Sequence, residues 1–436
     1  MNKLYIPVGS FSSVEPKDYV EVECLHETVQ GVLLPSNQKD FTVIKLSNGY
    51  NIGIHKRNIK NIAVIEQKKE HKEKPEKVSQ NEKLPKVTIL HTGGTIASKV
   101  DYTTGAVHPQ FTPEELLGLF PELKELANLN SRLVANLFSE NMRFDHYNVL
   151  AKEIEKEINA GARGIIITHG TDTLHYTAAA LSFVLENIPV PVVLVGAQRS
   201  SDRGSSDAAM NLISAVAFAV NSKFSGVAVC MHENDDDTNC VVIDGLHARK
   251  LHTSKRSAFV SVNRPLLAKV NYETKSISHI SMPEQTSGTF ALKLFDPKIK
   301  IGWIKSHPHF SEDEIVKDVD GLILEGTGLG HFPIEQVDAL TKEHVKIKKK
   351  LTELAKKIPV VMTSQCIFGR VNMNVYSLGR TEQEMGILGN GLDMPPETVF
   401  IKLAWLLSNF KKDIPALLAR NFRGELSERT EQDTSY

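Results

Sequence analysis

The pattern of hydrophobic and polar positions divides the chain into zones. In roughly the first 65 residues, short β-rich runs are separated by turn-prone segments such as SNQKD and SNG, a pattern typical of β-hairpins. The runs are residues 19–24, 29–34, 41–46, 50–54 and 62–65. So many short strands in so few residues indicate a small all-β barrel, a fold that closes its own sheet edges.

From residue 86 onward the pattern changes to strand, loop and helix. Compact apolar runs predict buried strands at 86–90, 164–168, 190–196 and 226–231. Apolar residues at helical spacing predict helices at 146–159, 174–185 and 208–220. This alternation is typical of an α/β fold in which helices cover both faces of a parallel sheet.

A second α/β unit is predicted from residue 298 to residue 420. Its expected strands are 299–305, 319–326 and 359–365, and its expected helices are 333–357 and 397–409. The first unit would then extend over 87–297 and contain the active site. Residues 421–436 are expected to form a polar tail.

Residues 67–86 separate the predicted barrel, 1–66, from the α/β units. This segment holds seven lysines and four glutamates and almost no apolar residue, so it cannot bury enough surface to fold alone. A solvated linker and an RNA-binding arm both fit this composition, and the linker is the commoner structure for such a charge run.

Composition narrows the class of protein. The 436 residues carry 51 basic and 52 acidic side chains, a net charge of -1, so nucleic acid would have to bind a local patch. No run of eighteen apolar residues predicts a membrane span, and the first residues lack the pattern of a secretion signal. The four cysteines show no C-x-x-C spacing, which favours a reducing cytoplasm and argues against structural zinc.

Four loops that follow predicted strands, or precede predicted helices, are rich in small polar residues. They are 92–99 (TGGTIASK), 139–142 (SENM), 168–173 (THGTDT) and 197–207 (AQRSSDRGSSD). Ligands of open parallel sheets bind where such loops leave the carboxyl ends of the strands. Four polar loops at equivalent places therefore predict one shared site.

Each motif also has a simpler interpretation. Thr171 and Asp172 lie where a helix begins, so they could serve only as helix caps. TGGT could be a phosphate-binding turn, although it lacks both G-x-G-x-x-G and the lysine of a P-loop. A nearby lysine would favour the catalytic interpretation over these, because a threonine hydroxyl needs a base or a cationic neighbour before it can act as a nucleophile. The stretch 245–259 offers two candidates, Lys250 and Lys255.

The motifs TGGTIAS, HGTDT and GAQRSSDRGSSDA resemble those of the asparaginase and glutaminase family, over roughly residues 86–420. The resemblance implies an asparaginase-like, two-domain parallel-sheet core that hydrolyses a side-chain amide through an acyl-threonine intermediate. It also implies that this chain uses no metal and no organic cofactor.

Carried over by motif, the resemblance implies catalytic roles for Thr95, Thr171, Asp172 and Lys250, and it implies that Tyr102 lies on a lid. Thr95 would be the attacking residue, although the division of labour between Thr95 and Thr171 stays open. Asp172 would hold the α-ammonium group of the substrate. Lys250 is preferred to the neighbouring Lys255, which is expected to be a surface charge.

The remaining predicted substrate contacts come from two further loops. Ser139 and Glu140 match the segment that receives the α-carboxylate and the α-ammonium group. Backbone N–H groups of the loops that contain Gly94 and Gly170 are expected to donate to the oxyanion.

The front barrel and the segment SQCIFGRVNMNVYSLGR (364–380) are similar to the D subunits of archaeal-type glutamyl-tRNA(Gln) amidotransferases. In that family, the D subunit releases ammonia from glutamine or asparagine. A partner E subunit uses ATP and Mg²⁺ to convert Glu-tRNA(Gln) to Gln-tRNA(Gln). The resemblance implies a homodimer within an assembly of two D and two E subunits, in contact with tRNA(Gln) through the complex.

Two other functions remain open from the sequence. A stand-alone cytoplasmic asparaginase would need the same catalytic residues but no front barrel, and a non-catalytic RNA-binding scaffold would need none of those residues. His232 and the three aspartates 235–237 could bind a metal, but a solvated loop is favoured because the spacing matches no EF-hand or zincin.

Overall fold

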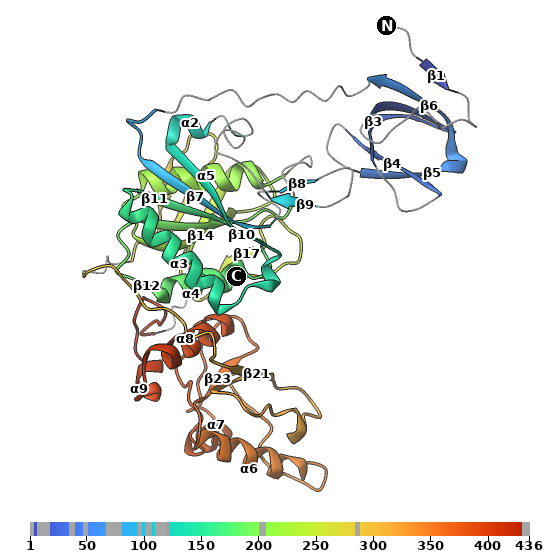
Figure 1. Ribbon diagram of the computed structural model, residues 1–436. Coiled ribbons are helices and arrows are strands. Elements are labelled where there is room, and N and C mark those ends of the chain that lie inside the picture. The colour runs from blue at the N-terminus through green and yellow to red at the C-terminus, as the bar shows by residue number, and fades with distance from the viewer. Residues whose placement is uncertain are drawn as a thin grey trace.

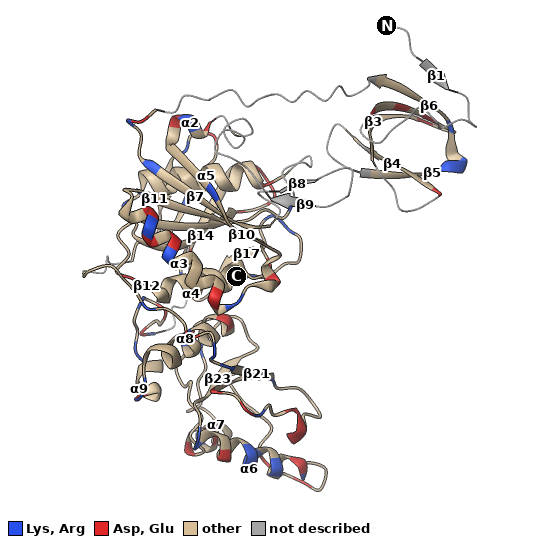
Figure 2. Cartoon of the chain, in the orientation of Figure 1, with Lys and Arg blue, Asp and Glu red and all other residues tan. Residues whose placement is uncertain are grey.

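The computed structural model describes residues 4–6, 18–34, 40–46, 51–66, 81–94, 98–100, 107–109, 120, 122–199, 206–283 and 288–429. They form an N-terminal sheet followed by two α/β units (Figure 1). Within these residues, no helix has the length and apolar character needed to cross a bilayer. Basic and acidic residues are interspersed along the ribbon (Figure 2), in line with the nearly neutral sequence.

The N-terminal sheet is antiparallel, with the strand order β1-β6-β2-β3-β4-β5. Its strands are β1 (Leu4–Ile6), β2 (Tyr19–Cys24), β3 (Thr28–Leu34), β4 (Phe41–Lys45), β5 (Asn51–His55) and β6 (Ile59–Glu66), with the 3₁₀ turn η1 (Lys56–Asn58). Inward residues alternate along β2, where Val20 and Val22 are fully buried. The five predicted strands are confirmed and β1 is added; among the described residues, no pairing of β1 with β5 closes the sheet.

The first α/β unit is built on an eight-stranded sheet of order β10-β7-β11-β13-β14-β15-β18-β19. The strands, in chain order, are β7 (Lys86–Gly93), β10 (Asn128–Leu137), β11 (Gly164–Thr168), β13 (Pro191–Val195), β14 (Gly226–His232), β15 (Asn239–Asp244), β18 (Ala268–Asn271) and β19 (Ile277–His279). The first five strands in the sheet order are parallel, as predicted. The last three are antiparallel, so the sheet is mixed.

Helices cover both faces of this sheet. The helices of the unit are α2 (Leu123–Leu126), α3 (Phe144–Asn159), α4 (Leu174–Val184) and α5 (Ala208–Asn221), with the 3₁₀ turn η3 (Ser139–Asn141). Residues of α3 and α4 belong to one hydrophobic core, whereas residues of α2 and α5 belong to the other. The predicted layers are therefore confirmed.

Short two-stranded ribbons complete the first unit. They are β8 (Ser98–Val100) with β9 (Val107–Pro109), β12 (Leu185–Glu186) with β20 (Ala291–Leu292), and β16 (Ala248–Lys250) with β17 (Phe259–Ser261). The β16–β17 ribbon carries Lys250, one of the residues predicted for the active site.

The second α/β unit contains the parallel sheet β21-β22-β23. Its elements are β21 (Ile301–Lys305), η4 (Glu312–Glu314), β22 (Gly321–Gly326), α6 (Glu343–Ala355), β23 (Val360–Ser364), α7 (Ser377–Glu384), α8 (Pro396–Asn409) and α9 (Ile414–Leu418). Helix α8 packs on α4 of the first unit. The two units thus share one hydrophobic core, which contains residues of α4 and of α8.

The helix predicted over 333–357 was too long at its start. Helix α6 begins at Glu343, because residues 337–341 form a turn held by side chains. Asp338 accepts from the backbone N–H groups of Leu340 and Thr341, and Thr341 accepts from the N–H of Val337. Local acceptors of this kind compete with the helical hydrogen bonds.

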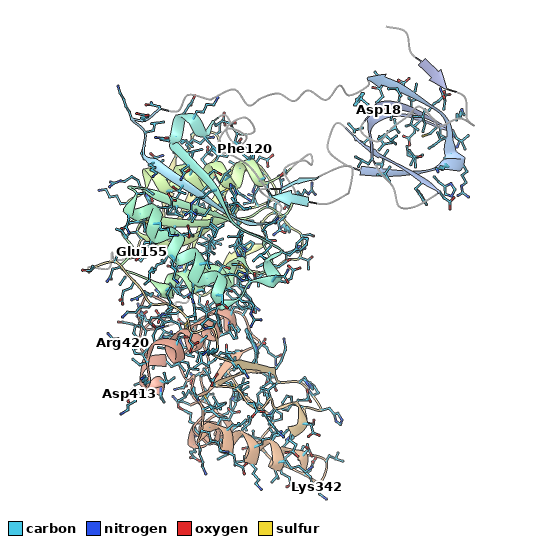
Figure 3. All side chains as sticks on the ribbon, in the orientation of Figure 1. Asp18, Phe120, Glu155, Lys342, Asp413 and Arg420 are labelled. Carbon is cyan, nitrogen blue, oxygen red and sulfur yellow. The ribbon has the colours of Figure 1, made fainter. Side chains whose placement is uncertain are left out.

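The predicted polar tail, 421–436, was also wrong in its first part, because residues 421–429 pack against the second unit. Glu425 is fully buried and lies 2.7 Å from the ammonium of Lys402 on α8. Lys402 also donates to the carbonyl groups of Leu418 and Arg420, at the end of α9. Asp413 and Arg420, labelled in Figure 3, flank this short helix.

Replacing Lys402 by methionine should destabilise the protein by about 3 kcal/mol or more, because Glu425 would remain buried without its partner. Chemical denaturation monitored by fluorescence would measure the loss. The Lys402→Met/Glu425→Leu double variant should recover most of it, and Lys356→Met, at an exposed position of the same unit, is the matched control. A Lys402→Met variant as stable as the control would contradict a stabilising role for this ion pair.

Candidate active site

Four loops converge at one edge of the eight-stranded sheet. They follow β10, β7, β11 and β13, which are neighbours in the sheet and run parallel, so their carboxyl ends meet (Figure 1). They are the described parts of the four polar loops predicted from the sequence. A pocket of about 330 Å³ lies there, lined by Gly94, Asn136, Leu137, Phe138, Ser139, Glu140, Gly170, Thr171, Asp172, Ala197, Gln198, Lys250 and Thr253.

Two glycines, Gly94 and Gly170, allow three of these loops to approach one another closely. Gly94 has a φ of +82°, and a Cβ atom at this position would lie 2.6 Å from the backbone nitrogen of Gly170. A Cβ at Gly170 would in turn lie 2.8 Å from the Cβ of Ser139. Side chains at positions 94 and 170 would therefore push the loops apart, so both glycines are needed for the loops to approach each other this closely.

Lys250 enters the pocket from outside these four strands. It ends β16, and its ammonium lies 2.8 Å from the hydroxyl of Thr171 and 2.8 Å from a carboxylate oxygen of Asp172. The Lys250 side chain is only 9% exposed, whereas that of Asp172 is 71% exposed. The cation is therefore largely removed from water, while the carboxylate reaches the open side of the pocket.

Thr171 and Asp172 do not cap helix α4. The capping position is occupied by Thr173, whose side chain makes no capping hydrogen bond and donates instead to the carbonyl of Ser139. This bond, of 2.6 Å, fixes the Ser139 loop to the start of α4. The hydroxyl of Thr171 and the carboxylate of Asp172 instead face Lys250.

Two buried histidines brace the loops. His169 contacts the carbonyl of Gly170 through Nδ1 and the hydroxyl of Thr177 through Nε2. His91 lies between the hydroxyls of Thr168 and Ser131. Burial lowers the pKa of each imidazole to about 4, so both rings are neutral near pH 7. Their role here is to hold neighbouring segments together through hydrogen bonds.

The ribbon that carries Lys250 is tied to the second unit. Arg249, next to Lys250, pairs with the carboxylate of Glu397 at 2.8 Å, and Glu397 lies in the first turn of α8. The Glu397 side chain is 8% exposed. Burial acts to raise the pKa of this carboxyl, and the charge of Arg249 acts to lower it.

The structure brings together most of the residues predicted for the site. Seven of them line the one pocket: Gly94, Ser139, Glu140, Gly170, Thr171, Asp172 and Lys250. Thr95 and Tyr102 lie outside the described residues, so their roles stay predictions. Lys255 points elsewhere, with its ammonium 3.7 Å from Asp235.

Sequence reasoning missed three polar residues of the pocket wall, Asn136, Gln198 and Thr253. Asn136 lies on the edge strand β10, which the sequence pattern did not reveal. Gln198 lies within the polar loop AQRSSDRGSSD, and Thr253 follows Lys250 by three residues, but neither residue type signals catalysis by itself.

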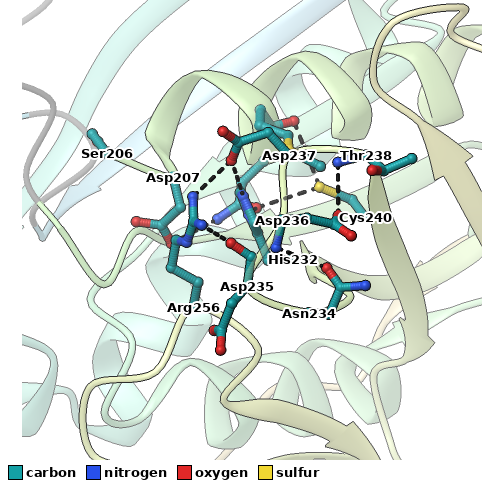
Figure 4. A network of polar contacts seen from close by, with 12 residues as sticks. Ser206, Asp207, His232, Asn234, Asp235, Asp236, Asp237, Thr238, Cys240 and Arg256 are labelled. Carbon is teal, nitrogen blue, oxygen red and sulfur yellow. Dashed lines mark hydrogen bonds and ion pairs between the residues drawn. The ribbon is translucent and has the colours of Figure 1, made fainter. Parts of the chain in front are cut away.

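The acidic loop after β14 forms a hydrogen-bond network (Figure 4). Arg256 pairs with the carboxylate of Asp237 at 2.7 Å and donates to the backbone carbonyl of Asp235. The buried His232 contacts the amide oxygen of Asn211 at 2.6 Å. Among the described residues, no cluster of three or more His, Cys, Asp or Glu is arranged to hold a metal.

Family models match three segments of the chain. They are described as Asparaginase, N-terminal (residues 86–283), Glutaminase/Asparaginase C-terminal domain (300–417) and GatD N-terminal domain (14–65). Among solved structures, the thermostable L-asparaginase from Thermococcus kodakarensis is 29% identical, with a TM-score of 0.69 over 79% of this chain and 100% of that one. L-asparaginase I from Vibrio cholerae is 27% identical, with a TM-score of 0.67, and the match covers 79% of this chain and 99% of that one.

Curated relatives match the chain over nearly its full length. The D subunit of glutamyl-tRNA(Gln) amidotransferase from Methanococcus maripaludis is 43% identical over 424 residues, covering 94% of this chain and 98% of the relative. The protein of the same name from Pyrococcus furiosus is 42% identical and covers 97% of each. The match includes the N-terminal sheet as well as the asparaginase-like core, and the chain belongs to the family of glutamyl-tRNA(Gln) amidotransferase D subunits.

Proposed function

We propose that this chain is the amidohydrolase subunit of a tRNA-dependent amidotransferase. It would release ammonia from glutamine or asparagine, and a partner subunit would use that ammonia to convert Glu-tRNA(Gln) to Gln-tRNA(Gln). The observation that carries the proposal is the contact of the Lys250 ammonium with Thr171 and Asp172, 2.8 Å in each case, inside the loop-lined pocket.

This geometry suits hydrolysis of a carboxamide. The reaction needs a nucleophile, a group that exchanges protons with it and with the departing nitrogen, and donors to the oxyanion. Lys250 lies in position to exchange a proton with the hydroxyl of Thr171. The glycine-bearing loops at Gly94 and Gly170 bring backbone groups to the same place.

We assign the first attack to Thr95, on the motif resemblance, and the proton transfer to Thr171 and Lys250. In this scheme Lys250 acts as the neutral amine. The hydroxyl oxygen of Thr95 bonds to the amide carbon, and the hydroxyl proton passes through the hydroxyl of Thr171 to the amine of Lys250, which becomes an ammonium. Collapse of the tetrahedral intermediate breaks the carbon–nitrogen bond, and ammonia leaves with a returned proton. Water then cleaves the acyl-threonine ester. Ser139, Glu140 and Asp172 would hold the amino-acid head group, and Tyr102 would close the pocket.

The name of the relatives describes one subunit of a larger enzyme, which is why we propose a partner. We infer a homodimer of this chain bound to two E subunits in the cytoplasm, with ATP and Mg²⁺ bound by the E subunit and tRNA(Gln) bound by the complex. The matched N-terminal domain, residues 14–65, also favours the amidotransferase over a stand-alone asparaginase, because amide hydrolysis alone does not require it.

Ammonia release should depend on the assembled complex. We expect at least a tenfold rise in kcat when the E subunit and Glu-tRNA(Gln) are added to this chain, because closure of a lid often completes a site only in the full complex. A coupled glutamate dehydrogenase assay with glutamine or asparagine would measure it.

The same assay separates the competing functions. Full-rate hydrolysis by the free chain, unchanged by partner or tRNA, would favour a stand-alone asparaginase. Absence of ammonia release from either amide, even in the assembled complex, would contradict the proposed amidohydrolase activity.

A further inference from the structure

Gln198 lines the catalytic pocket, and the scheme above gives it no role. It follows β13 and the buried Ala197, and it lines the same pocket as Thr171 and Lys250. Its neighbour Gly196 packs against Thr171, since a Cβ at position 196 would lie 2.7 Å from the Thr171 methyl group. The segment 196–198 is therefore in direct contact with the catalytic threonine loop.

The order of strands in the sheet indicates which end of a substrate Gln198 faces. The loops along the pocket follow the order β10, β7, β11, β13, so Ser139 and Glu140 lie at one end and Gln198 at the other. Under the proposed function, Ser139, Glu140 and Asp172 hold the head group of the amino acid. None of these three residues lies in the loop after β13, so that loop is left to face the carboxamide. The carboxamide would then extend toward Thr171 and the Gln198 end.

The backbone of Gln198 is rigidly anchored. Asp207, which is fully buried, accepts from the backbone N–H groups of Gln198 and Arg199 at 3.0 Å each. Asn211 donates to Asp207 and to the carbonyl of Gly196, and His232 in turn contacts Asn211. These bonds fix the backbone of Gln198 beside the pocket, so only its side-chain torsions remain to be ordered when a ligand binds.

The side-chain amide nitrogen of Gln198 is shielded from water and has no hydrogen-bond partner among the described residues. Buried polar groups are nearly always satisfied, so an exception calls for an explanation. Because Gln198 lines the pocket, a hydrogen-bond acceptor on a bound ligand would satisfy its unpaired amide nitrogen.

We propose that Nε2 of Gln198 donates a hydrogen bond to the carbonyl oxygen of the substrate carboxamide. This inference rests on the proposed function and extends it. It makes Gln198 a substrate-contacting residue that hydrogen-bonds to the carboxamide being hydrolysed. When the hydroxyl oxygen adds to the amide carbon, the π electrons move onto the carbonyl oxygen. The bond from Gln198 then strengthens, because its acceptor has become an anion.

Gln198→Met tests this proposal, because methionine has nearly the same length and volume but no N–H donor. We expect kcat for ammonia release to fall by about 10²–10³-fold, as for other lost oxyanion donors, with a small change in KM and an unchanged thermal unfolding midpoint. Gln30→Met, at an exposed position of β3 where the amide bonds to Glu21, is the matched control. Wild-type kcat in Gln198→Met would overturn the proposal.

Gln198→Glu gives a second, independent measurement. It tests the role of Gln198 even if the methionine variant does not fold. A carboxylate at this position only accepts hydrogen bonds, whereas its protonated form can donate one. The activity of this variant relative to wild type should therefore rise as the pH falls. A ratio that stays constant with pH, or wild-type activity throughout, would overturn the proposal.

Ammonia release by the wild-type complex distinguishes failure of the proposed function from failure of the role proposed for Gln198. If the wild-type complex releases no ammonia, the proposed function fails and with it the role of Gln198. If the wild type is active and both Gln198 variants match it, only the role of Gln198 fails.

Discussion

Replacing Lys250 by methionine should lower kcat for ammonia release by about 10³–10⁴-fold, with little change in the thermal unfolding midpoint. Methionine keeps most of the apolar stem but removes the ammonium that contacts Thr171 and Asp172. This is the upper part of the range expected for loss of a positioned proton-transfer group. Steady-state kinetics with glutamine and asparagine, in the assembled complex, would measure it.

Lys255→Met is the matched control for this experiment. Lys255 lies five residues further along the chain, is 47% exposed and points to Asp235, so its removal should leave kcat within about twofold, as is usual for a surface charge. Equal activity of the Lys250→Met and Lys255→Met variants would remove Lys250 from the mechanism. A collapse of both variants would indicate instead that the segment 250–255 matters for folding.

Replacing Thr171 by valine should reduce kcat by about 10²–10⁴-fold, the range for loss of a proton-transfer group. Valine has nearly the same shape, so the contact of the side chain with Gly196 is kept, but Lys250 loses the hydroxyl to which it is bonded. The measurement is again ammonia release, accompanied by circular dichroism to check the fold. Thr352→Val, where the hydroxyl only bonds back to its own helix, should be nearly silent.

Combining the two substitutions tests whether the residues act as one unit. Residues that act together in one step give non-additive losses. The Thr171→Val/Lys250→Met double variant should therefore be no more than about tenfold slower than the slower single variant. Losses that multiply fully would show that Thr171 and Lys250 contribute independently, and the proton-transfer role assigned to the pair would have to be abandoned.

The central parallel strands could be predicted closely from the sequence. Residues 164–168 are fully buried on both faces in β11, and such strands appear in a sequence as unbroken apolar runs. Strand β10 escaped prediction for the opposite reason. It lies at the edge of the sheet, and of its residues only Leu129 is buried, so its sequence NLNSRLVANL shows no clear period.

Much of the pocket could be predicted because its chemistry is concentrated in short motifs. Ser139, Thr171, Asp172 and Gly170 lie in loops whose position follows directly from a parallel sheet. The close approach of the Gly94 and Gly170 backbones, and the anchoring of Gln198 by Asp207, could not be predicted in this way. They depend on how loops that are distant in sequence pack, and no local pattern encodes that.

The prediction of a polar tail fails for residues 421–429 because a polar side chain is not always exposed. Glu425 is polar and yet has no exposed surface, since its partner Lys402 is buried in α8. A run of apolar residues in this segment would have predicted burial. A buried ion pair leaves no such pattern, because each partner looks like an ordinary surface charge in the sequence.

The ion pair of Arg249 with Glu397 limits how this enzyme can move. Arg249 precedes Lys250 in the same short strand, and Glu397 belongs to the helix that packs the second unit onto the first. A hinge rotation of one unit against the other would pull on that strand and draw the lysine away from Thr171. Opening and closing during turnover should therefore be carried by individual loops over a fixed two-unit frame, and a fragment cut off before residue 298 would lack the anchor that aligns its own lysine.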